Sequence, residues 1–253
     1  CPPRPLLDSA AVGLLSLFQR PVCLEPQDLH VDAFDLRQLL RQHGVQPSRQ
    51  VVRLVVRQSV RPALLRGQPV GDLGIIGQMP MLKKLKLWSV EGATNSAALA
   101  SLANLESFDI TSDFNKKGGE AFDLAATAGW NKVRSISLEG AEVINADKIG
   151  ALPELMQVKL SKVNQKSGTP INVSGFAKAP KLGLLTIYDC TVSGLESFVN
   201  PKLRRISLRN VKGITSLEGL KACPDLYQIE IQNCDMPDSA LQGFDSKVKI
   251  TKR

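Results

Sequence analysis

A short apolar pattern recurs along most of this sequence, and it limits the folds that the chain can adopt. In each copy, an apolar residue is followed by two variable residues, a second apolar residue, one variable residue and a third apolar residue. The eight complete copies begin at Val51, Leu82, Leu105, Val133, Leu155, Leu182, Leu203 and Leu226, and a truncated copy is Val248-x-Ile250. The complete copies begin 31, 23, 28, 22, 27, 21 and 23 residues apart.

This spacing predicts an α/β solenoid with a parallel sheet. The alternating centre of each copy indicates a short strand with one buried face. The remaining ~15–20 residues of each unit return over the convex side and bring the next strand alongside. No unit can bury its apolar face alone, so only the stack is stable. A doubly wound α/β domain is the alternative, but its units are usually about 30 residues or longer. We assign the extra residues of the longer units to convex loops, including 111–119 and 164–169.

Two copies carry a longer motif that resembles the leucine-rich-repeat family. These copies are Leu182-x-x-Leu185-x-Ile187-x-x-Cys190-x-Val192 and Leu226-x-x-Ile229-x-Ile231-x-x-Cys234-x-Met236. The stretch from Cys223 to Leu241 also resembles the cysteine-containing subtype of the family. Other copies depart from the pattern, with Val90, Val163 and Val211 where Asn or Cys is usual. The resemblance covers roughly residues 50–253 and implies a leucine-rich-repeat solenoid with a parallel concave sheet.

The residues before the repeats have a different pattern. Residues 6–19 and 32–43 each place apolar side chains on one helical stripe, and Gly44 provides a helix stop. We therefore expect a helical N-terminal cap at 1–47, which covers the first apolar layer, and the solenoid at 48–253.

Composition and motifs argue for binding rather than catalysis. The net charge of +8 favours an acidic partner. His30 and His43 are the only histidines, and the sequence has no nucleophile elbow, phosphate-binding loop or zinc-protease motif. We predict a protein that is not an enzyme, with no cofactor and no metal site. We interpret Cys190, Cys223 and Cys234 as reduced structural thiols rather than as a disulfide or redox pair.

In a parallel stack, equivalent variable positions of the strands line up in columns on the concave face. The middle column reads Val55, Lys86, Asp109, Ser137, Lys159, Thr186, Ser207, Glu230 and Lys249. The columns predict a basic patch with an adjacent aromatic ring at the first strands, a floor of serines, and then a cluster of aromatic and arginine side chains. Trp, Tyr and Arg are frequent binding hot spots. The predicted partner-binding residues are Arg53, Arg57, Lys84, Lys86, Trp88, Lys159, Tyr188, Arg205, Arg209 and Tyr227.

Three functions are compatible with these patterns. The first is recognition of an acidic protein by the concave face. Because the sequence starts at Cys1, this protein could be a bacterial lipoprotein that is tethered in the periplasm through a lipid on Cys1 and neutralises a toxin or enzyme. The second is an intracellular adaptor that resembles the repeat subunits of ubiquitin ligases. The third is nucleic-acid binding through the basic N-terminal patch, which the acidic residues in the columns disfavour. Without the lipid on Cys1, we expect no membrane contact and a cytoplasmic protein.

Overall fold

The computed structural model describes residues 63–66, 71–88, 90, 92–111, 119–149 and 151–253. The predicted helical cap at 1–47, the copy at Val51, and Cys1, Arg53 and Arg57 lie outside these residues. Within the described ranges, no helix has the length and apolar character needed to cross a bilayer.

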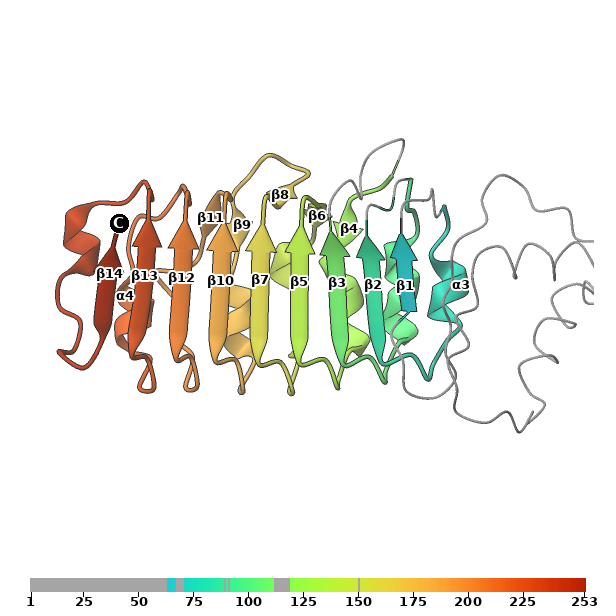
Figure 1. Ribbon diagram of the computed structural model, residues 1–253, viewed down its shortest axis with the longest axis horizontal. Helices are drawn as coiled ribbons and strands as arrows, with labels where there is room; N and C mark the ends of the chain where they lie inside the picture. Colours follow the sequence, from blue (N-terminus) through green and yellow to red (C-terminus); the bar gives the residue numbers. More distant parts are fainter. Residues whose placement is uncertain (1–62, 67–70, 89, 91, 112–118, 150) are drawn as a thin grey trace, which may run out of the picture. The chain divides into compact units, whose positions relative to one another are not determined.

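In the described residues, nine parallel strands form one sheet in which neighbours follow chain order (Figure 1). The strands are β1 (Ala63–Arg66), β2 (Lys84–Trp88), β3 (Ser107–Thr111), β5 (Ser135–Glu139), β7 (Gln157–Ser161), β10 (Leu184–Tyr188), β12 (Arg205–Arg209), β13 (Gln228–Gln232) and β14 (Lys249–Lys252). One such strand per repeat is the arrangement that the recurring pattern predicts.

Short helical turns cover the back of this sheet (Figure 1). They are α3 (Gly74–Gly77), η1 (Ser96–Ser101), η2 (Leu124–Gly129), η3 (Ala146–Lys148), η4 (Ser174–Lys178), α4 (Glu218–Lys221) and η5 (Asp238–Leu241). Shorter strands pair at the edge where the main strands end: β4 (Phe122–Asp123), β6 (Glu142–Ile144) and β8 (Asn164–Gln165) in one small sheet, and β9 (Ile171–Asn172) and β11 (Val192–Ser193) in another. The extra residues at 164–169 therefore begin as a strand rather than as a loop.

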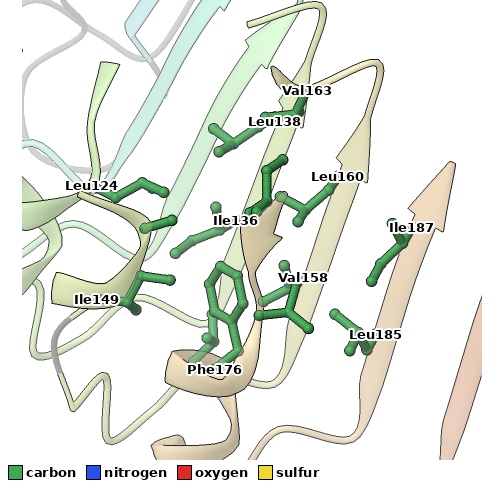
Figure 2. Packing of buried hydrophobic residues seen from close by; sticks show 14 of the residues in the cluster. Leu124, Ile136, Leu138, Ile149, Val158, Leu160, Val163, Phe176, Leu185 and Ile187 are labelled. Atoms are coloured by element: carbon green, nitrogen blue, oxygen red, sulfur yellow. The ribbon is translucent and has the colours of Figure 1, made fainter. Parts of the chain in front are cut away.

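One continuous apolar core runs through the stack. Strand residues at the second and third apolar positions of the pattern, such as Ile136 and Leu138, are buried. Figure 2 shows these side chains, together with those of β7 and β10, lying against Leu124, Ile149 and Phe176 from the helical turns. The equivalent residues of the whole sheet belong to the same cluster: Leu85, Phe108, Ile136, Val158, Leu185, Ile206 and Ile229. The predicted solenoid is confirmed.

The core is less purely aliphatic than the scarcity of aromatic residues suggests. Phe108, Phe122 and Trp130 form a cluster with ring centroids 4.7–6.4 Å apart. The indole Nε1–H of Trp130 donates to the carbonyl oxygen of Leu99 at 2.8 Å, so the buried polar atom is satisfied.

Both ends of the sheet differ from the prediction. The strand beside β2 is β1, in which Ala63 pairs with Leu85, so the predicted pairing of the copies that start at Val51 and Leu82 is wrong. The sequence carries a further copy of the apolar pattern here, Val60-x-x-Ala63-x-Leu65, which was not among the predicted copies. Its offset of 22 residues from β2 matches the other units better than the predicted step of 31. In β14, Lys249 pairs with Gln228 and Thr251 with Glu230. The predicted columns are therefore shifted by two residues in this strand, which keeps the same face outward because side chains alternate.

The residue after each of five strands adopts a left-handed backbone conformation, at Gly140, Lys162, Asp189, Asn210 and Asn233. The backbone N–H of each of these residues donates to the carbonyl oxygen of the last residue of the next strand, or of the residue after it. For example, Lys162 N–H donates to Tyr188 O at 3.0 Å. The turn therefore continues the ladder between layers.

We expect Lys162→Gly to raise the free energy of unfolding by about 0.5–1 kcal/mol. The left-handed conformation (φ 51°) costs a side-chain-bearing residue about 1–2 kcal/mol, and the larger unfolded-state entropy of glycine offsets about half of this gain. Urea denaturation measures the change. Lys166→Gly, at an exposed lysine outside the left-handed region, is the control and should not stabilise. A loss of stability in Lys162→Gly would contradict the argument.

Candidate functional site

The face of the sheet opposite the helical turns carries the alternate side chains of each strand, and we call it the open face. From β2 to β13 its columns have the predicted register, for example Lys86 beside Asp109 and Ser137 beside Lys159. At the first described strands, Lys86 lies with its Nζ 5.5 Å from the centroid of the Trp88 ring, and Lys84 is exposed nearby. The predicted contribution of Arg53 and Arg57 to this patch lies outside the described residues, and β1 occupies the ladder position that was predicted for them.

The middle of the open face is polar and internally paired. Lys159 forms an ion pair with Glu139 at 3.2 Å, and Gln157 donates to the hydroxyl of Ser135 at 3.0 Å. A hollow of about 270 Å³ lies here over the predicted serine floor. We call it the neutral hollow. The residues that line it are Ser135, Ile136, Ser137, Gln157, Val158, Lys159, Leu184 and Thr186. Because Lys159 is neutralised by Glu139, it is a weaker candidate for partner binding than the sequence predicted.

Tyr188 and Arg209 form a stacked pair on the open face. The guanidinium carbon of Arg209 lies 4.2 Å from the ring centroid of Tyr188. The Tyr188 hydroxyl lies 3.4 Å from that of Ser207 on the neighbouring strand. Tyr188 therefore lies along the sheet rather than against a flanking loop. Stacking holds the guanidinium flat and leaves its N–H edge free for an acceptor.

A second hollow of about 270 Å³ begins at this pair and extends to β14. We call it the charged hollow. Arg209, Lys249 and Arg253 line it together with one carboxylate, Glu230, which accepts a hydrogen bond from Gln228 at 2.6 Å. Cations outnumber carboxylates in this lining, so its field favours a negatively charged group.

Arginines and lysines differ in how they are paired. Between described residues, every ion pair is made by a lysine, as in Lys181 with Glu154 and Lys202 with Asp225. Arg204, Arg205 and Arg209 have no such partner there. The Nε of Arg205 is buried and has no hydrogen-bond partner. Most buried polar atoms are paired in native proteins, so this nitrogen is an exception among the described side chains.

Tyr227 lies where the strands begin, next to the open face. It is 47% exposed, and its backbone N–H bonds to the carbonyl oxygen of Arg204. The structure places Tyr188 beside Arg209 where β10 and β12 end, as the columns predict. Arg205 lies where β12 begins, and Tyr227 precedes β13 at the same edge of the sheet. Arg204 was missed because it occupies a position outside the three columns, although the Arg-Arg pair was visible in the sequence.

The three described cysteines form no disulfide with one another, and their interpretation as reduced structural thiols stays a prediction. Cys190 accepts a hydrogen bond from the Val163 N–H at 3.4 Å and donates to Tyr188 O at 3.0 Å. Cys223 accepts from the Asn200 N–H at 3.3 Å. Burial raises the pKa of both thiols. The cysteines thus connect adjacent layers, while the resemblance to the cysteine-containing subtype stays a prediction.

We expect Cys190 and Cys223 to resist alkylation by iodoacetamide at pH 8 in the folded protein. The thiolate is the reactive form, and a raised pKa lowers its population at that pH. Half-buried Cys234 should be modified before them, and urea should remove the protection. Mass spectrometry of the peptides gives the rates. Equal rates at Cys190 and Cys234 in the folded state would contradict this expectation.

Neither a protein-family model nor a curated protein matches this sequence. Among solved structures, an internalin C2 from Listeria monocytogenes is similar, with a TM-score of 0.54 and 18% identity over 76% of this chain and 80% of that chain. The described residues form a leucine-rich-repeat solenoid. A second internalin (inlF) from the same organism has a TM-score of 0.46 and 17% identity over 87% of this chain and 75% of its own. The leucine-rich-repeat domain of the type III effector XopL has a TM-score of 0.45 and 13% identity over 90% and 85%. At these identities the likeness concerns the fold.

Proposed function

We propose that the open face of this leucine-rich-repeat solenoid binds a protein that presents acidic side chains, and that β12 is the centre of the contact. The observation that carries this proposal is the arginine group Arg204, Arg205 and Arg209, which has no ion-pair partner among the described residues. Repeat solenoids commonly bind partners across their extended sheet surface, so the fold is consistent with this use.

The buried Nε of Arg205 adds an energetic reason for binding. An unpaired buried donor costs about 1–3 kcal/mol, and a change of the Arg205 rotamer that turns its guanidinium outward to a carboxylate of a partner would recover this energy. The planar guanidinium of Arg209, held on Tyr188, matches a carboxylate through two parallel hydrogen bonds. Both arginines are therefore better placed for an interface than the lysines that already form ion pairs, such as Lys159 with Glu139.

The distribution of charge favours a protein over a nucleic acid. Asp109, Glu139 and Glu230 lie on the open face among the cations, and Lys159 is paired. A protein that binds a nucleic-acid duplex needs a continuous basic surface along the phosphates of the duplex. An acidic protein needs only a local group of cations opposite its carboxylates, and this complementarity of charge also speeds association. The predicted lipid on Cys1, the periplasmic location, the role as an inhibitor and the alternative of an intracellular adaptor stay predictions.

Photo-cross-linking from the open face tests the proposal. Benzoylphenylalanine replaces Thr186, which lines the neutral hollow and pairs with Ser207 in the lining of the charged hollow. In a matched control it replaces exposed Ala128 in η2 on the back of the sheet. We expect one acidic protein from the source cells to be cross-linked through position 186 and not through position 128. The same products from both positions, or products that nuclease treatment removes, would overturn the proposal.

A further inference from the structure

The residue just before each strand forms a row along the edge of the open face, and Gly183 interrupts this row. From β7 to β13 the row reads Met156, Gly183, Arg204 and Tyr227. Backbone hydrogen bonds join each to the next, from Gly183 N to Met156 O at 2.9 Å, from Arg204 N to Gly183 O at 2.9 Å and from Tyr227 N to Arg204 O at 3.1 Å. The four positions are therefore adjacent in space.

The fold does not require glycine at position 183. A Cβ atom there would meet only the carbonyl oxygens of Lys202 at 3.7 Å and Met156 at 3.9 Å, which are ordinary contacts, and its φ lies outside the left-handed region. By contrast, a Cβ at Gly219 would approach the Phe198 nitrogen to 2.4 Å, so that glycine is a packing requirement. The missing side chain at position 183 leaves a notch in the row between Met156 and Arg204, whose strand backbones are about 10 Å apart, or two strand spacings.

Exposed apolar side chains lie near this notch, with Met156 on the adjacent strand and Tyr227 two strands further along the row. Met156 is 54% exposed and Tyr227 is 47% exposed. Leu184, the next residue after Gly183, is half-buried and also lines the neutral hollow. Scattered apolar side chains are normal on a surface, but a group of them beside an opening indicates a binding site.

Cations flank the same notch. Arg204 is exposed and Arg205 is partly buried, and neither has an ion-pair partner among the described residues. On the other side of Met156, Arg134 is exposed at the same level of the row. An occupant with an apolar side chain between acidic residues would match both the apolar opening and its basic margins.

We propose that the notch at Gly183 receives an aliphatic side chain of an acidic segment of the partner protein, with its carboxylates beside Arg204 and Arg205. This inference rests on the proposed function, and it extends the contact from the open face to the edge where the strands begin. The glycine acts as a specificity-determining position, because a side chain there would exclude the occupant without disturbing the fold.

Selection of peptides from a displayed library of random linear 12-residue peptides tests the notch. On the wild-type protein we expect enrichment of sequences with Leu, Ile or Val next to Asp or Glu. On Gly183→Trp, and on Gly183→Lys as a second variant, this enrichment should fall at least tenfold while the thermal unfolding midpoint stays that of the wild type. The control Lys178→Trp places the same bulk on the back of the sheet, at an exposed lysine of η4, and should bind as the wild type does.

The outcomes separate the notch from the broader proposal. Equal enrichment on wild type and both Gly183 variants, with loss on Arg205→Ala and Arg209→Ala, would overturn the notch and leave the arginine surface standing. Enrichment that none of these variants changes would overturn both. Absence of aliphatic and acidic sequences on the wild type would also overturn the notch, and cross-linking through position 186 would then decide the proposed function separately.

Discussion

Trp130→Ala should lower the free energy of unfolding by about 3–5 kcal/mol, the usual range for removing a large buried aromatic side chain. Trp130 is 1% exposed and contacts Phe108 and Phe122 in the middle of the stack. The substitution removes these contacts and leaves the carbonyl oxygen of Leu99 without its side-chain donor. Because each layer of a solenoid contacts only its neighbours, a cavity at this point weakens the connection between the two halves of the sheet.

Two control substitutions show how much of this loss in stability comes from the hydrogen bond and how much from burial of the ring. Trp130→Phe keeps most of the ring volume but loses the hydrogen bond to Leu99, so we expect a smaller loss, about 1–3 kcal/mol. Trp88→Ala removes a half-buried indole from the open face and should cost less than Trp130→Ala. Urea denaturation followed by circular dichroism measures all three. A Trp130→Ala midpoint equal to that of the wild type would show that the aromatic cluster does not hold these layers together.

Reversing the charge of Arg205 and Arg209 together should weaken binding of the partner captured through position 186 by at least 100-fold. A single hot spot contributes about 2 kcal/mol or more, which is about 30-fold in affinity. Glutamate at both positions also adds repulsion against an acidic surface, and it removes the cation stacked on Tyr188. Titration of the purified pair by calorimetry gives the change in Kd.

The matched control is Lys148→Glu with Lys178→Glu. These exposed lysines lie in η3 and η4 on the back of the sheet, and the double substitution changes the net charge by the same amount. We expect its Kd to stay within about threefold of the wild type, because screening by salt limits the reach of surface charges to about 8–10 Å. An equal loss in both double variants would mean that net charge, rather than the β12 arginines, controls the affinity.

Most of the solenoid could be predicted because the recurring apolar pattern carries two kinds of information at once. Its alternation within a copy determines which side chains are buried, as at Ile136 and Leu138, and its return every 21–28 residues from Leu82 onward determines that the strands are parallel and stacked. Together these place Tyr188 and Arg209 in one column, so the contact between their side chains follows from residues 21 positions apart.

The ends of the sheet and the state of each charge were decided only by the tertiary structure. The sequence offers two candidates for the strand beside β2, the copy at Val51 and the copy Val60-x-x-Ala63-x-Leu65, and the pairing of Ala63 with Leu85 selects the second. Lys159 and Arg209 were both predicted to bind a partner. Of the two, only Lys159 forms an ion pair among the described residues, with Glu139 on the adjacent strand, whereas Arg209 stacks on Tyr188. Apolar periodicity reports burial, which is a property of each position along the chain. Pairing and side-chain openings such as that at Gly183 depend on which residues the stacked layers bring together, and a linear pattern does not contain that information.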